Sequence, residues 1–352
     1  MARILSFGKA VNEALHIAMA RDRQVVTFGL GIDDPKRIFG TTDGLLEAFG
    51  PSRVFDMPIS ENAMTGVAIG ASLNGIRPVM THQRLDFFLL AMDQLVNNAA
   101  KWYYMFGGVR PVPITIRLIL GRGWGQGPQH SQNLQSWFAH IPGLKVVMPS
   151  TAHDAKGLLL SAIFDDNPVV YLEHRWLHSI EGEVPEGDYR VPLGQAQILS
   201  QGQDLTLVSL SYMTIEALHA IEHLSRQGVT CDLIDLRSVN PIDWPLIFKS
   251  VLKTGRLMAL DTANQTLSIA SEVIARVSME LFDKLKAAPV RIALPDYPTP
   301  TSPALAAGYY PRAEDIIRAA ASLLHRPLDT GDIIRSRTSP HDVPGNWFKG
   351  PF

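Results

Sequence analysis

Short runs rich in β-branched residues alternate with helix-length segments along the first half of this 352-residue chain. Strands joined by an intervening helix pair in parallel, because the helix carries the chain back to the starting edge of the sheet. The pattern therefore predicts an α/β fold, with a mainly parallel sheet covered by helices on both faces. We expect the strands at residues 24–29, 53–57, 77–81, 112–118, 145–149 and 168–173.

The alternation starts again after residues 174–195, a stretch rich in glycine, proline and charge that is typical of a linker. We therefore expect a first domain over residues 1–185, a second and smaller α/β domain over 186–325, and a C-terminal arm over 326–352. The arm has no clear period, and it is either wrapped on the protein or loose. The second domain is predicted to have strands at 205–211, 230–236, 256–261 and 289–295 and helices at 213–227, 241–254, 267–286 and 312–325.

Two helical segments of the first domain have distinct patterns. Residues 1–22 are predicted to form an amphipathic helix that ends at a charged stop. Residues 85–105 are apolar nearly all round, which predicts a central helix buried on more than one side.

The charge balance excludes two classes of partner. With 32 Lys and Arg against 34 Asp and Glu, the net charge of -2 offers no basic surface for nucleic acid or anionic lipid. No segment approaches the ~18 uninterrupted apolar residues of a membrane span. Cys231 is the single cysteine, so an internal disulfide is excluded, and we expect this residue in the core of a soluble, cytoplasmic protein.

Glu61 is a charge between a strand-like stretch and a run of small residues, "MPISENAM". A helix that begins with Ser60 as N-cap places Glu61 in the first turn, where the helix dipole stabilises a carboxylate. That structural interpretation is sufficient by itself. Alternatively, a carboxylate at the carboxyl end of a parallel sheet lies where ligands bind and can take part in proton chemistry.

The histidines offer two further candidate sites. His174 and His178 are four residues apart, but no third ligand accompanies them, so a metal site is disfavoured. The stretch 121–132, "GRGWGQGPQHSQ", has four glycines in seven residues before His130. Such a loop is either a plain connection or one that approaches a ligand closely or moves as a lid.

Several common catalytic motifs are absent from the sequence. There is no G-x-S-x-G elbow of a serine hydrolase, no G-x-x-x-x-G-K-[ST] phosphate loop and no G-x-G-x-x-G after a strand. A serine hydrolase, a P-loop enzyme and a standard Rossmann dehydrogenase are therefore disfavoured.

Longer motifs indicate a family. The stretches "RVFDMPISENAMTGVAIGASLNGIRPV", "AMDQLVNNAAKWYYMFGG", "PQHSQ" and "PGLKVVMPSTAHDAKGLLLSAIFDDNPVVYLE" closely resemble the beta subunit of the thiamin-diphosphate-dependent first component of 2-oxo acid dehydrogenase complexes. That family includes the pyruvate, branched-chain 2-oxo acid and acetoin enzymes. The resemblance covers about residues 8–325 and implies a transketolase-like pyrimidine-binding domain followed by a transketolase C-terminal domain.

The resemblance also implies roles for individual residues. Glu61 is expected to hydrogen-bond a ring nitrogen of the aminopyrimidine and so to activate the cofactor, Phe87 to stack on that ring and Ile59 to line it. His130 is expected to act in transfer to the lipoyl group. A potassium ion is expected in a loop formed by Ile114, Ala162, Ile163, Asp165 and Asn167. The local alternative for that loop is a helix that ends before Pro168.

One missing motif bears on assembly. Relatives that hold the diphosphate through magnesium use a G-D-G motif, and this chain has none. The resemblance therefore implies an alpha subunit that supplies the diphosphate half of the site, an alpha2-beta2 heterotetramer and a lipoyl acyltransferase component as a further partner.

Two positions depart from the family pattern. Leu30 stands where pyruvate-type relatives have an acid, and Arg84 stands where relatives are usually uncharged. Arg84 is either a partner for an anionic substrate or a surface or subunit-contact residue. We predict a 2-oxo acid dehydrogenase beta subunit, active only with an alpha subunit. The alternatives are a split transketolase-like synthase with a non-lipoyl acceptor and a non-catalytic scaffold.

Overall fold

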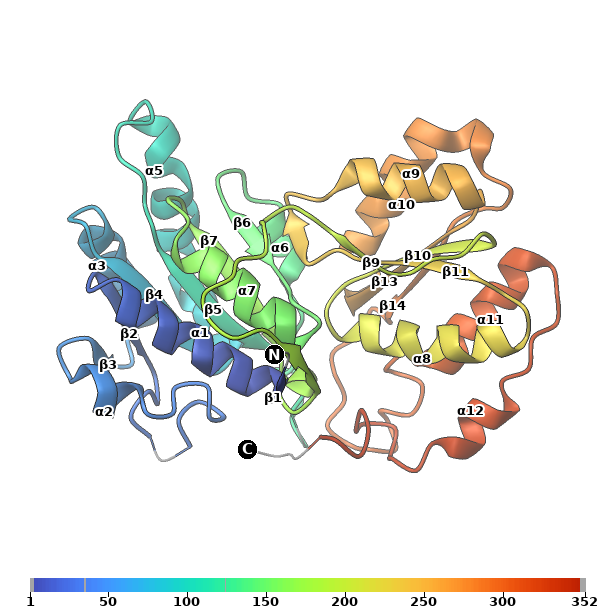
Figure 1. Ribbon diagram of the computed structural model, residues 1–352, viewed down its shortest axis with the longest axis horizontal. Helices are drawn as coiled ribbons and strands as arrows, with labels where there is room; N and C mark the ends of the chain where they lie inside the picture. The colour runs from blue at the N-terminus through green and yellow to red at the C-terminus, as the bar shows by residue number, and fades with distance from the viewer. Residues whose placement is uncertain (1–2, 35, 124, 349–352) are drawn as a thin grey trace.

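The computed structural model describes residues 3–34, 36–123 and 125–348, and it has two lobes, each built on its own sheet (Figure 1). The first lobe contains a seven-stranded sheet in the order β12-β6-β7-β5-β4-β2-β3. All neighbours in it are parallel except β12, which pairs antiparallel with β6. The six expected strands are β2 (Val25–Gly29), β3 (Val54–Asp56), β4 (Arg77–His82), β5 (Thr115–Leu120), β6 (Lys145–Val147) and β7 (Val169–His174). The predicted fold class is confirmed.

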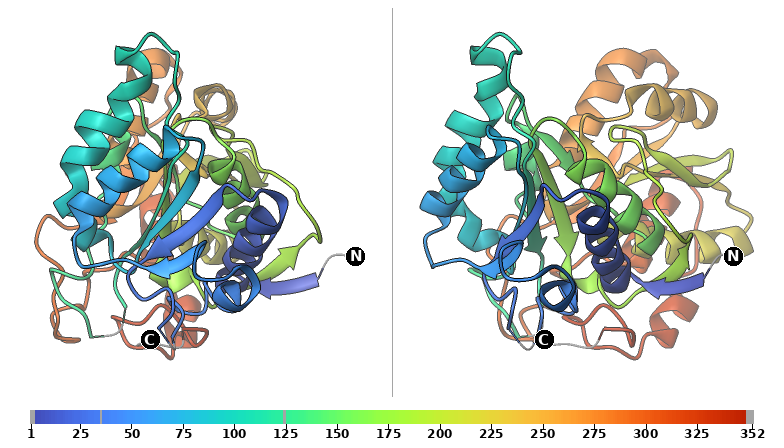
Figure 2. Two further views of the ribbon diagram at one scale, coloured as in Figure 1. Left: turned by 90° about the vertical axis from the view of Figure 1, so that its left-hand side faces the viewer. Right: turned by 60° about the vertical axis from the view of Figure 1, so that its left-hand side comes forward.

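Helices cover both faces of this sheet because its strands are apolar on both sides. In β5, Ile116, Leu118 and Leu120 join one buried cluster, whereas Ile119 joins the cluster on the opposite face. Figure 2 shows the sheet between these helical layers. One face carries α1 (Phe7–Arg21) and α7 (Ala152–Ile163), and the other carries α3 (Glu61–Ser72), α4 (Leu85–Phe88), the 3-10 turn Leu89–Ala91, the π-helix Gln94–Ala99, α5 (Ala100–Met105) and α6 (Gln135–Ala139).

The second lobe has a five-stranded sheet in the order β14-β13-β10-β11-β9, antiparallel only at β9 (Gln197–Ser200). Its expected strands are β10 (Leu205–Ser209), β11 (Cys231–Asp235), β13 (Leu257–Asn264) and β14 (Val290–Leu294). The four expected helices are α8 (Tyr212–Arg226), α9 (Trp244–Thr254), α10 (Ile269–Leu281) and α11 (Ala313–Leu324). Cys231 is buried, as predicted.

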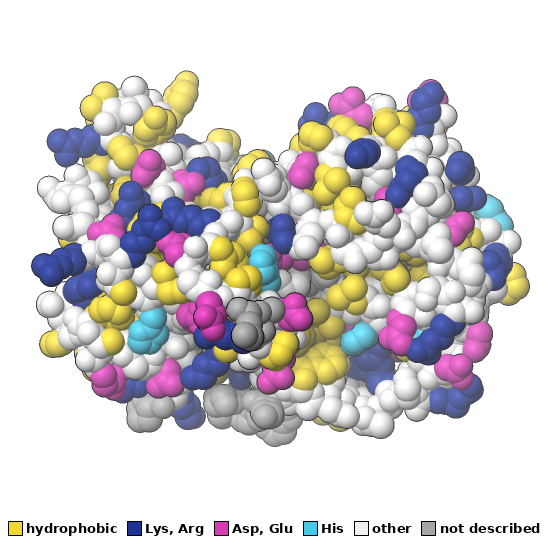
Figure 3. All heavy atoms as spheres, viewed as in Figure 1, with side chains coloured by type: hydrophobic (Ala, Val, Ile, Leu, Met, Phe, Trp, Pro, Cys, Tyr) yellow, Lys and Arg dark blue, Asp and Glu magenta, His cyan; other side chains and the backbone are white. Residues whose placement is uncertain are grey.

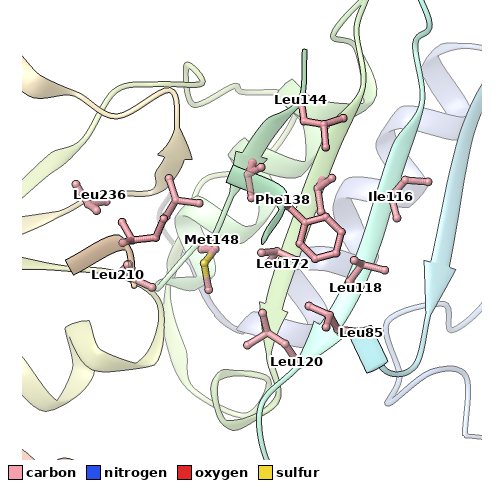
Figure 4. Close-up of a cluster of buried hydrophobic side chains, with 14 of the residues drawn as sticks. Leu85, Ile116, Leu118, Leu120, Phe138, Leu144, Met148, Leu172, Leu210 and Leu236 are labelled. Atoms are coloured by element: carbon pink, nitrogen blue, oxygen red, sulfur yellow. The ribbon is translucent and has the colours of Figure 1, made fainter. Parts of the chain in front are cut away.

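The two lobes share a core. Leu210 and Leu236 at the ends of second-lobe strands pack in the same cluster as Met148 and Leu172 of the first lobe (Figure 4). Strand β12 (Ser238–Asn240), which follows β11 in the chain, also adds to the first sheet. The sequence pattern missed β12 because a three-residue strand carries almost no period.

The N-terminal segment differs from its prediction. Residues 3–6 form strand β1 (Arg3–Ser6), which pairs antiparallel with β8 (Glu181–Val184) inside the predicted linker. Helix α1 therefore begins only at Phe7, with the Ser6 side chain as its N-cap. A two-stranded pairing between segments this far apart depends on the tertiary fold, so local periodicity could not indicate it.

Residues 85–105 also differ from the prediction of one helix buried on several sides. The segment is helical for most of its length but passes through a 3-10 turn, Leu89–Ala91, and a π-helix, Gln94–Ala99. Leu90 is 68% exposed and Tyr104 is 89% exposed, so one apolar side is uncovered in this chain. Hydrophobic residues at the α5 end stand at the upper left of Figure 3. For this chain alone, the prediction of a helix buried on several sides is not met. An uncovered apolar side of this kind is typical of a surface that another chain covers.

The C-terminal arm wraps on the protein as far as Phe348. After α12 (Gly331–Ser336), Asp342 accepts a 2.9 Å hydrogen bond from Arg122 Nη2, and Trp347 Nε1 donates to the carbonyl of Trp176 at 3.4 Å. Of the two alternatives, the wrapped arm is observed. Among the described residues, no helix has both the length and the apolar character that crossing a bilayer requires.

Candidate active site

The candidate residues lie at the carboxyl edge of the first sheet. Parallel strands end at the same edge, so the segments after β3, β4, β5 and β7 meet there. Glu61 follows β3, Phe87 follows β4 and His130 follows β5. This edge places the predicted residues on one side of the molecule although they span 70 positions of the sequence.

Glu61 opens helix α3 as predicted, but Ser60 does not cap that helix through its side chain. The Glu61 side chain is only 5% exposed. Its carboxylate receives no hydrogen bond and forms no ion pair with any described residue. A nearly buried carboxylate without a protein donor is costly, so this group remains available to accept a hydrogen bond.

The residues beside Glu61 are open to a partner. Ile59 is 86% exposed two positions earlier, and Val67 is 59% exposed one and a half turns into the helix. Gly66 lies against Gln94, whose Oε1 would be 3.4 Å from a β-carbon at that position, whereas Gly70 faces open space. The small residues of α3 therefore allow close packing on both sides, and only one of these sides is filled by this chain.

Phe87 and His130 are brought together. Phe87 is 41% exposed, and its ring meets the half-buried His130 ring edge to face, with centroids 5.3 Å apart and planes at 87°. Helix α4 and the glycine-rich loop are joined just beyond His130, because Asp86 Oδ1 accepts a 2.8 Å hydrogen bond from Gln132 Nε2. Burial raises the pKa of Asp86, although the hydrogen bonds from Gln132 oppose that effect. The contact fixes the loop over the aromatic ring.

Glycine is required where the loop leaves β5. Gly121 has a φ of +77°, and a β-carbon there would stand 2.4 Å from Nε2 of the buried His174. No larger residue fits this approach without moving that histidine. The glycine-rich segment is therefore packed at its start and anchored at its end, and it holds His130 between these points.

The predicted potassium loop is held by two cations of the chain. Arg77 Nη1 donates to the carbonyls of Ile163 at 3.4 Å and Asp165 at 3.0 Å. Lys145 Nζ forms a 2.5 Å ion pair with the Asp165 carboxylate. The carbonyls of Ile114 and Ala162 accept from Val169 and Asp165 backbone N–H groups, and the Asn167 N–H donates to Asp165 Oδ1.

The histidines of "HRWLH" are packed into the core. His174 Nδ1 accepts a hydrogen bond from the backbone N–H of Trp176, and burial lowers the pKa of His174 to about 3. His178 Nε2 lies 3.3 Å from Glu173 Oε2. Burial lowers the pKa of His178 as well. No group of three or more His, Cys, Asp or Glu side chains arranged for a metal ion occurs within residues 3–34, 36–123 and 125–348.

Two buried arginines lie at the same edge, and sequence reasoning singled out one of them. Arg84 is 5% exposed, so of its alternatives the surface residue is wrong. Arg175, directly after β7, is 3% exposed and was not singled out at all. A charged residue that follows a buried strand at the carboxyl edge is the signal that could have identified Arg175 as well.

Two grooves flank the joint between the lobes. One of about 1060 Å³ lies between α6 and α10 and includes Trp137, Leu267 and Ile269 in its lining. A second, of about 690 Å³, runs from Pro128 and Ser131 to Tyr297 and Tyr309 and borders the glycine-rich loop. Neither groove is lined by Glu61 or Phe87.

The fold and the site define a transketolase-like protein. Residues 4–179 match the family described as "Transketolase, pyrimidine binding domain", and residues 194–316 match "Transketolase, C-terminal domain". A solved "Split gene transketolase, inactive beta4 tetramer" has the same fold, with a TM-score of 0.73 and 23% identity over 91% of this chain and 98% of that one.

Curated relatives narrow the class. The acetoin:2,6-dichlorophenolindophenol oxidoreductase subunit beta of Cupriavidus necator is 42% identical, over 91% of this chain and 97% of that protein. The pyruvate dehydrogenase E1 component subunit beta of Bacillus subtilis is 38% identical, over 90% and 97%. The chain belongs to the family formed by the beta subunits of these acetoin and pyruvate dehydrogenases. The resemblance stated from the motifs is confirmed.

Proposed function

We propose that this chain is the beta subunit of a thiamin-diphosphate-dependent 2-oxo acid dehydrogenase. With an alpha subunit, it decarboxylates a 2-oxo acid oxidatively and passes the acyl group to a lipoyl carrier. The observation that carries the proposal is the Glu61 carboxylate, which is 5% exposed and lacks a donor among the described residues. Its relatives at 38–42% identity are beta subunits of dehydrogenases, which supports the same activity here.

The residues of this edge fit the pyrimidine half of the cofactor. An aminopyrimidine needs a hydrogen-bond acceptor for a protonated ring nitrogen, an aromatic face and an apolar wall. Glu61 offers the acceptor, Phe87 an exposed ring and Ile59 an exposed apolar side chain. When bound, thiamin diphosphate supplies the carbon acid and the electron sink that decarboxylation requires.

In the chemistry, the residues of this chain hold or move protons and position the reacting groups. Glu61 stands in the first turn of α3, where its carboxyl group can accept a hydrogen bond from the ring nitrogen. The carboxylate then fixes the protonation state of the nitrogen that it contacts. His130, held against Phe87 by the loop, is proposed to give a proton to the lipoyl sulfur that is released when the disulfide opens during transfer.

The other half of the site is assigned to an alpha subunit, with magnesium and the diphosphate on its side. Helix α3 leaves Val67 and Gly70 uncovered, and Tyr104 at the end of α5 is 89% exposed. An uncovered apolar surface beside an unpaired carboxylate is what an incomplete interface site presents. We further propose an alpha2-beta2 assembly, a lipoyl acyltransferase partner, a cytoplasmic location and domain boundaries near residues 185 and 325.

A potassium ion is proposed in the loop of Ile114, Ala162, Ile163, Asp165 and Asn167. Carbonyl and carboxylate oxygens suit such a hard cation, and a carbonyl that accepts one hydrogen bond keeps a second lone pair. Arg77 and Lys145 neutralise part of the oxygen charge, so the loop is ordered by the chain itself and the ion adds to that order.

The test is reconstitution. The chain is purified alone, an alpha chain from the same organism is purified alone, and the two are mixed. We expect thiamin diphosphate binding by calorimetry, and turnover of a 2-oxo acid with an artificial electron acceptor, only in the mixture. Cofactor binding or turnover by the beta chain alone would contradict the shared site, and an inactive mixture that binds no cofactor would favour a scaffold.

The split transketolase-like synthase is not favoured. Its support is the likeness to the split-gene transketolase, which at 23% identity speaks for the fold alone. The reconstituted complex distinguishes the two activities, since only the dehydrogenase requires a lipoyl domain for full turnover without an artificial acceptor.

A further inference from the structure

Two arginines at the carboxyl edge of the first sheet are buried without a partner. Neither Arg84 nor Arg175 donates a side-chain hydrogen bond or forms an ion pair with any of the described residues. Nη1 of Arg84 and Nε of Arg175 are fully enclosed and unbonded. Because an uncompensated buried cation is strongly unfavourable, such a pair calls for an anion that is absent from the chain itself.

The two guanidinium groups share one wall. Arg175 Cζ lies 4.3 Å and Arg84 Cζ lies 5.5 Å from the centre of the Phe39 ring. The pKa of each arginine is lowered to about 10, chiefly by burial, and the charge of Arg84 contributes to the lowering at Arg175. Both groups stay charged at neutral pH, so their mutual repulsion persists until a negative charge balances it.

The segment that carries Phe39 is strained. Three consecutive non-glycine residues, Arg37, Ile38 and Phe39, have φ angles of 46°, 47° and 58°. A run of left-handed residues is unfavourable and persists where surrounding contacts require it. Here it places one aromatic ring within cation–π distance of both guanidinium groups, which holds the two cations on the same wall.

The acidic group that faces this cluster does not neutralise it. Asp86 is close enough to raise the pKa of Arg84, but its Oδ1 binds Gln132 and it forms no ion pair with Arg84. Glu173, one strand position before His174, is taken by Arg117 at 2.7 Å. Two positive charges against one carboxylate leave the cluster with a net positive charge.

The glycine-rich loop approaches Arg84 closely. A β-carbon at Gly123 would stand 3.2 Å from Arg84 Nη2 and 2.5 Å from Gln126 Oε1, so only glycine lets the backbone come this near to the guanidinium group. Gln126 is held there by the N–H of Gly123 at 2.8 Å. This part of the loop leads directly to His130, and Arg84 stands three positions before Phe87, so the cluster adjoins the proposed catalytic residues.

We propose that Arg84 and Arg175 form an anion-binding site that receives a second negatively charged group, at the far end of the 2-oxo acid substrate. The inference rests on the function proposed above and names its substrate class, a 2-oxo acid with a terminal carboxylate or phosphate. Arginine pairs bind either oxyanion through paired N–H donors. A neutral side chain would leave both cations unpaired.

The experiment uses the reconstituted alpha–beta complex and two substrates of equal chain length, 2-oxoglutarate and 2-oxovalerate. They differ only in the charge at the far end. We expect kcat/KM for 2-oxoglutarate to exceed that for 2-oxovalerate by at least about tenfold. Arg84→Gln and Arg175→Gln should remove this preference through KM, whereas Arg23→Gln at an exposed position should preserve it.

Binding without turnover supplies a second readout. Calorimetry with glutarate and with inorganic phosphate on the cofactor-loaded complex separates the two oxyanions, and the tighter of them identifies the group. We expect Arg84→Gln to weaken that binding by about tenfold or more, and Arg84→Lys to restore part of it. The lysine variant keeps the proposal testable if glutamine impairs folding.

Three results would overturn the site. Equal use of both substrates together with no anion binding would remove it. An equal loss for both substrates in Arg84→Gln would show that the arginine reads the 2-oxo carboxylate that they share. Failure of both Arg84 variants to assemble would assign the arginine to an alpha-subunit carboxylate. Arginine-dependent anion binding without turnover of any 2-oxo acid would instead refute the proposed activity and retain the anion site.

Discussion

Buried charges are paired in the interior of the first sheet and unpaired at its carboxyl edge. Inside the sheet, Arg117 and Glu173 are both fully buried and are joined by two hydrogen bonds, at 2.7 and 3.1 Å. Arg117 Nη1 donates a third hydrogen bond to the Thr81 hydroxyl at 3.3 Å. Burial raises the pKa of Glu173, but the charges and hydrogen bonds of Arg117 and His178 together outweigh that effect, and the pKa lies below its usual value. At the edge, Glu61, Arg84 and Arg175 have no such partners among the described residues.

The difference teaches how to separate structural from functional charge in this molecule. A paired buried ion is already compensated, so its removal affects mainly the folded state. An unpaired buried ion weakens the folded state until its partner arrives, so its removal affects mainly binding and turnover. The following predictions test that division, from the largest expected effect to the smallest.

Glu61→Gln should lower turnover of the reconstituted complex by about 10²–10⁴-fold, because the amide cannot act as the proton-accepting group. Assembly with the alpha chain should be retained and the melting temperature of the chain alone should not fall, since no described residue donates to this carboxylate. Steady-state kinetics and sedimentation check both parts. Glu280→Gln, on the exposed side of α10, is the matched control. Normal turnover in Glu61→Gln would refute the catalytic role.

Glu173→Gln should have the opposite profile. It leaves the Arg117 cation buried without its counter-ion, which is expected to destabilise the protein by ~3–5 kcal/mol. Denaturant unfolding of the variant measures this loss, and Glu183→Gln on the exposed strand β8 serves as control. A loss below about 1 kcal/mol would mean that pairing does not distinguish the interior from the edge.

His130→Ala should slow acyl transfer and leave decarboxylation unchanged. If His130 acts in transfer, acylation of a lipoyl domain falls by about 10²-fold while decarboxylation with an artificial acceptor is retained. His140→Ala, on the same connection but outside the Phe87 contact, is the control. Wild-type rates in both assays would remove His130 from the mechanism.

Asp235 tests a third way to bury a carboxyl group, as the neutral acid. Burial, aided by the nearby Asp154 charge, raises its pKa to about 7. Because the folded state holds this proton more tightly than the unfolded state, the stabilisation is complete below the unfolded pKa, near ~4, and is lost as the pH rises through about 7. Asp235→Asn should therefore gain roughly 1–3 kcal/mol relative to wild type between pH 5 and pH 8. Unfolding midpoints at the two pH values check this, and parallel pH profiles would contradict it.

Potassium should have the smallest effect. At a concentration ten times its dissociation constant, an ion bound only by the folded state adds about 1.4 kcal/mol. Melting temperatures in potassium and in tetramethylammonium chloride of equal ionic strength measure this, with Asp165→Asn as the variant that should abolish the difference. Identical melting of the wild-type protein in the two salts would exclude the ion site.

Sequence periodicity predicted most of the fold. Ten strands were predicted because each lies in an apolar run of at least five residues between helix-length segments, even where, as in β3 and β6, only three residues pair. The strands β1, β8, β9 and β12 were missed, because they lie outside such an alternation and their pairing depends on partners far along the chain. The start of α3 was predicted correctly, while the side-chain cap expected at Ser60 is absent.

For the candidate site too, one part was predicted from the sequence and another part was seen only in the structure. Motifs of this chain identified Glu61, Phe87 and His130 by their local context, and the family comparisons agree with the resemblance that those motifs carry. The pairing of Phe87 with His130 and the burial of Arg84 beside Arg175 were beyond the sequence, because each joins segments from different strands.

The sequence by itself determined the alternating α/β architecture, the family and the residue types at the carboxyl edge, since these depend on local period and on motifs a few residues long. The tertiary structure alone decided which charges are compensated. A side chain's cost of burial depends on the atoms around it, and in this protein those atoms come from strands that are distant in the chain and adjacent in the sheet.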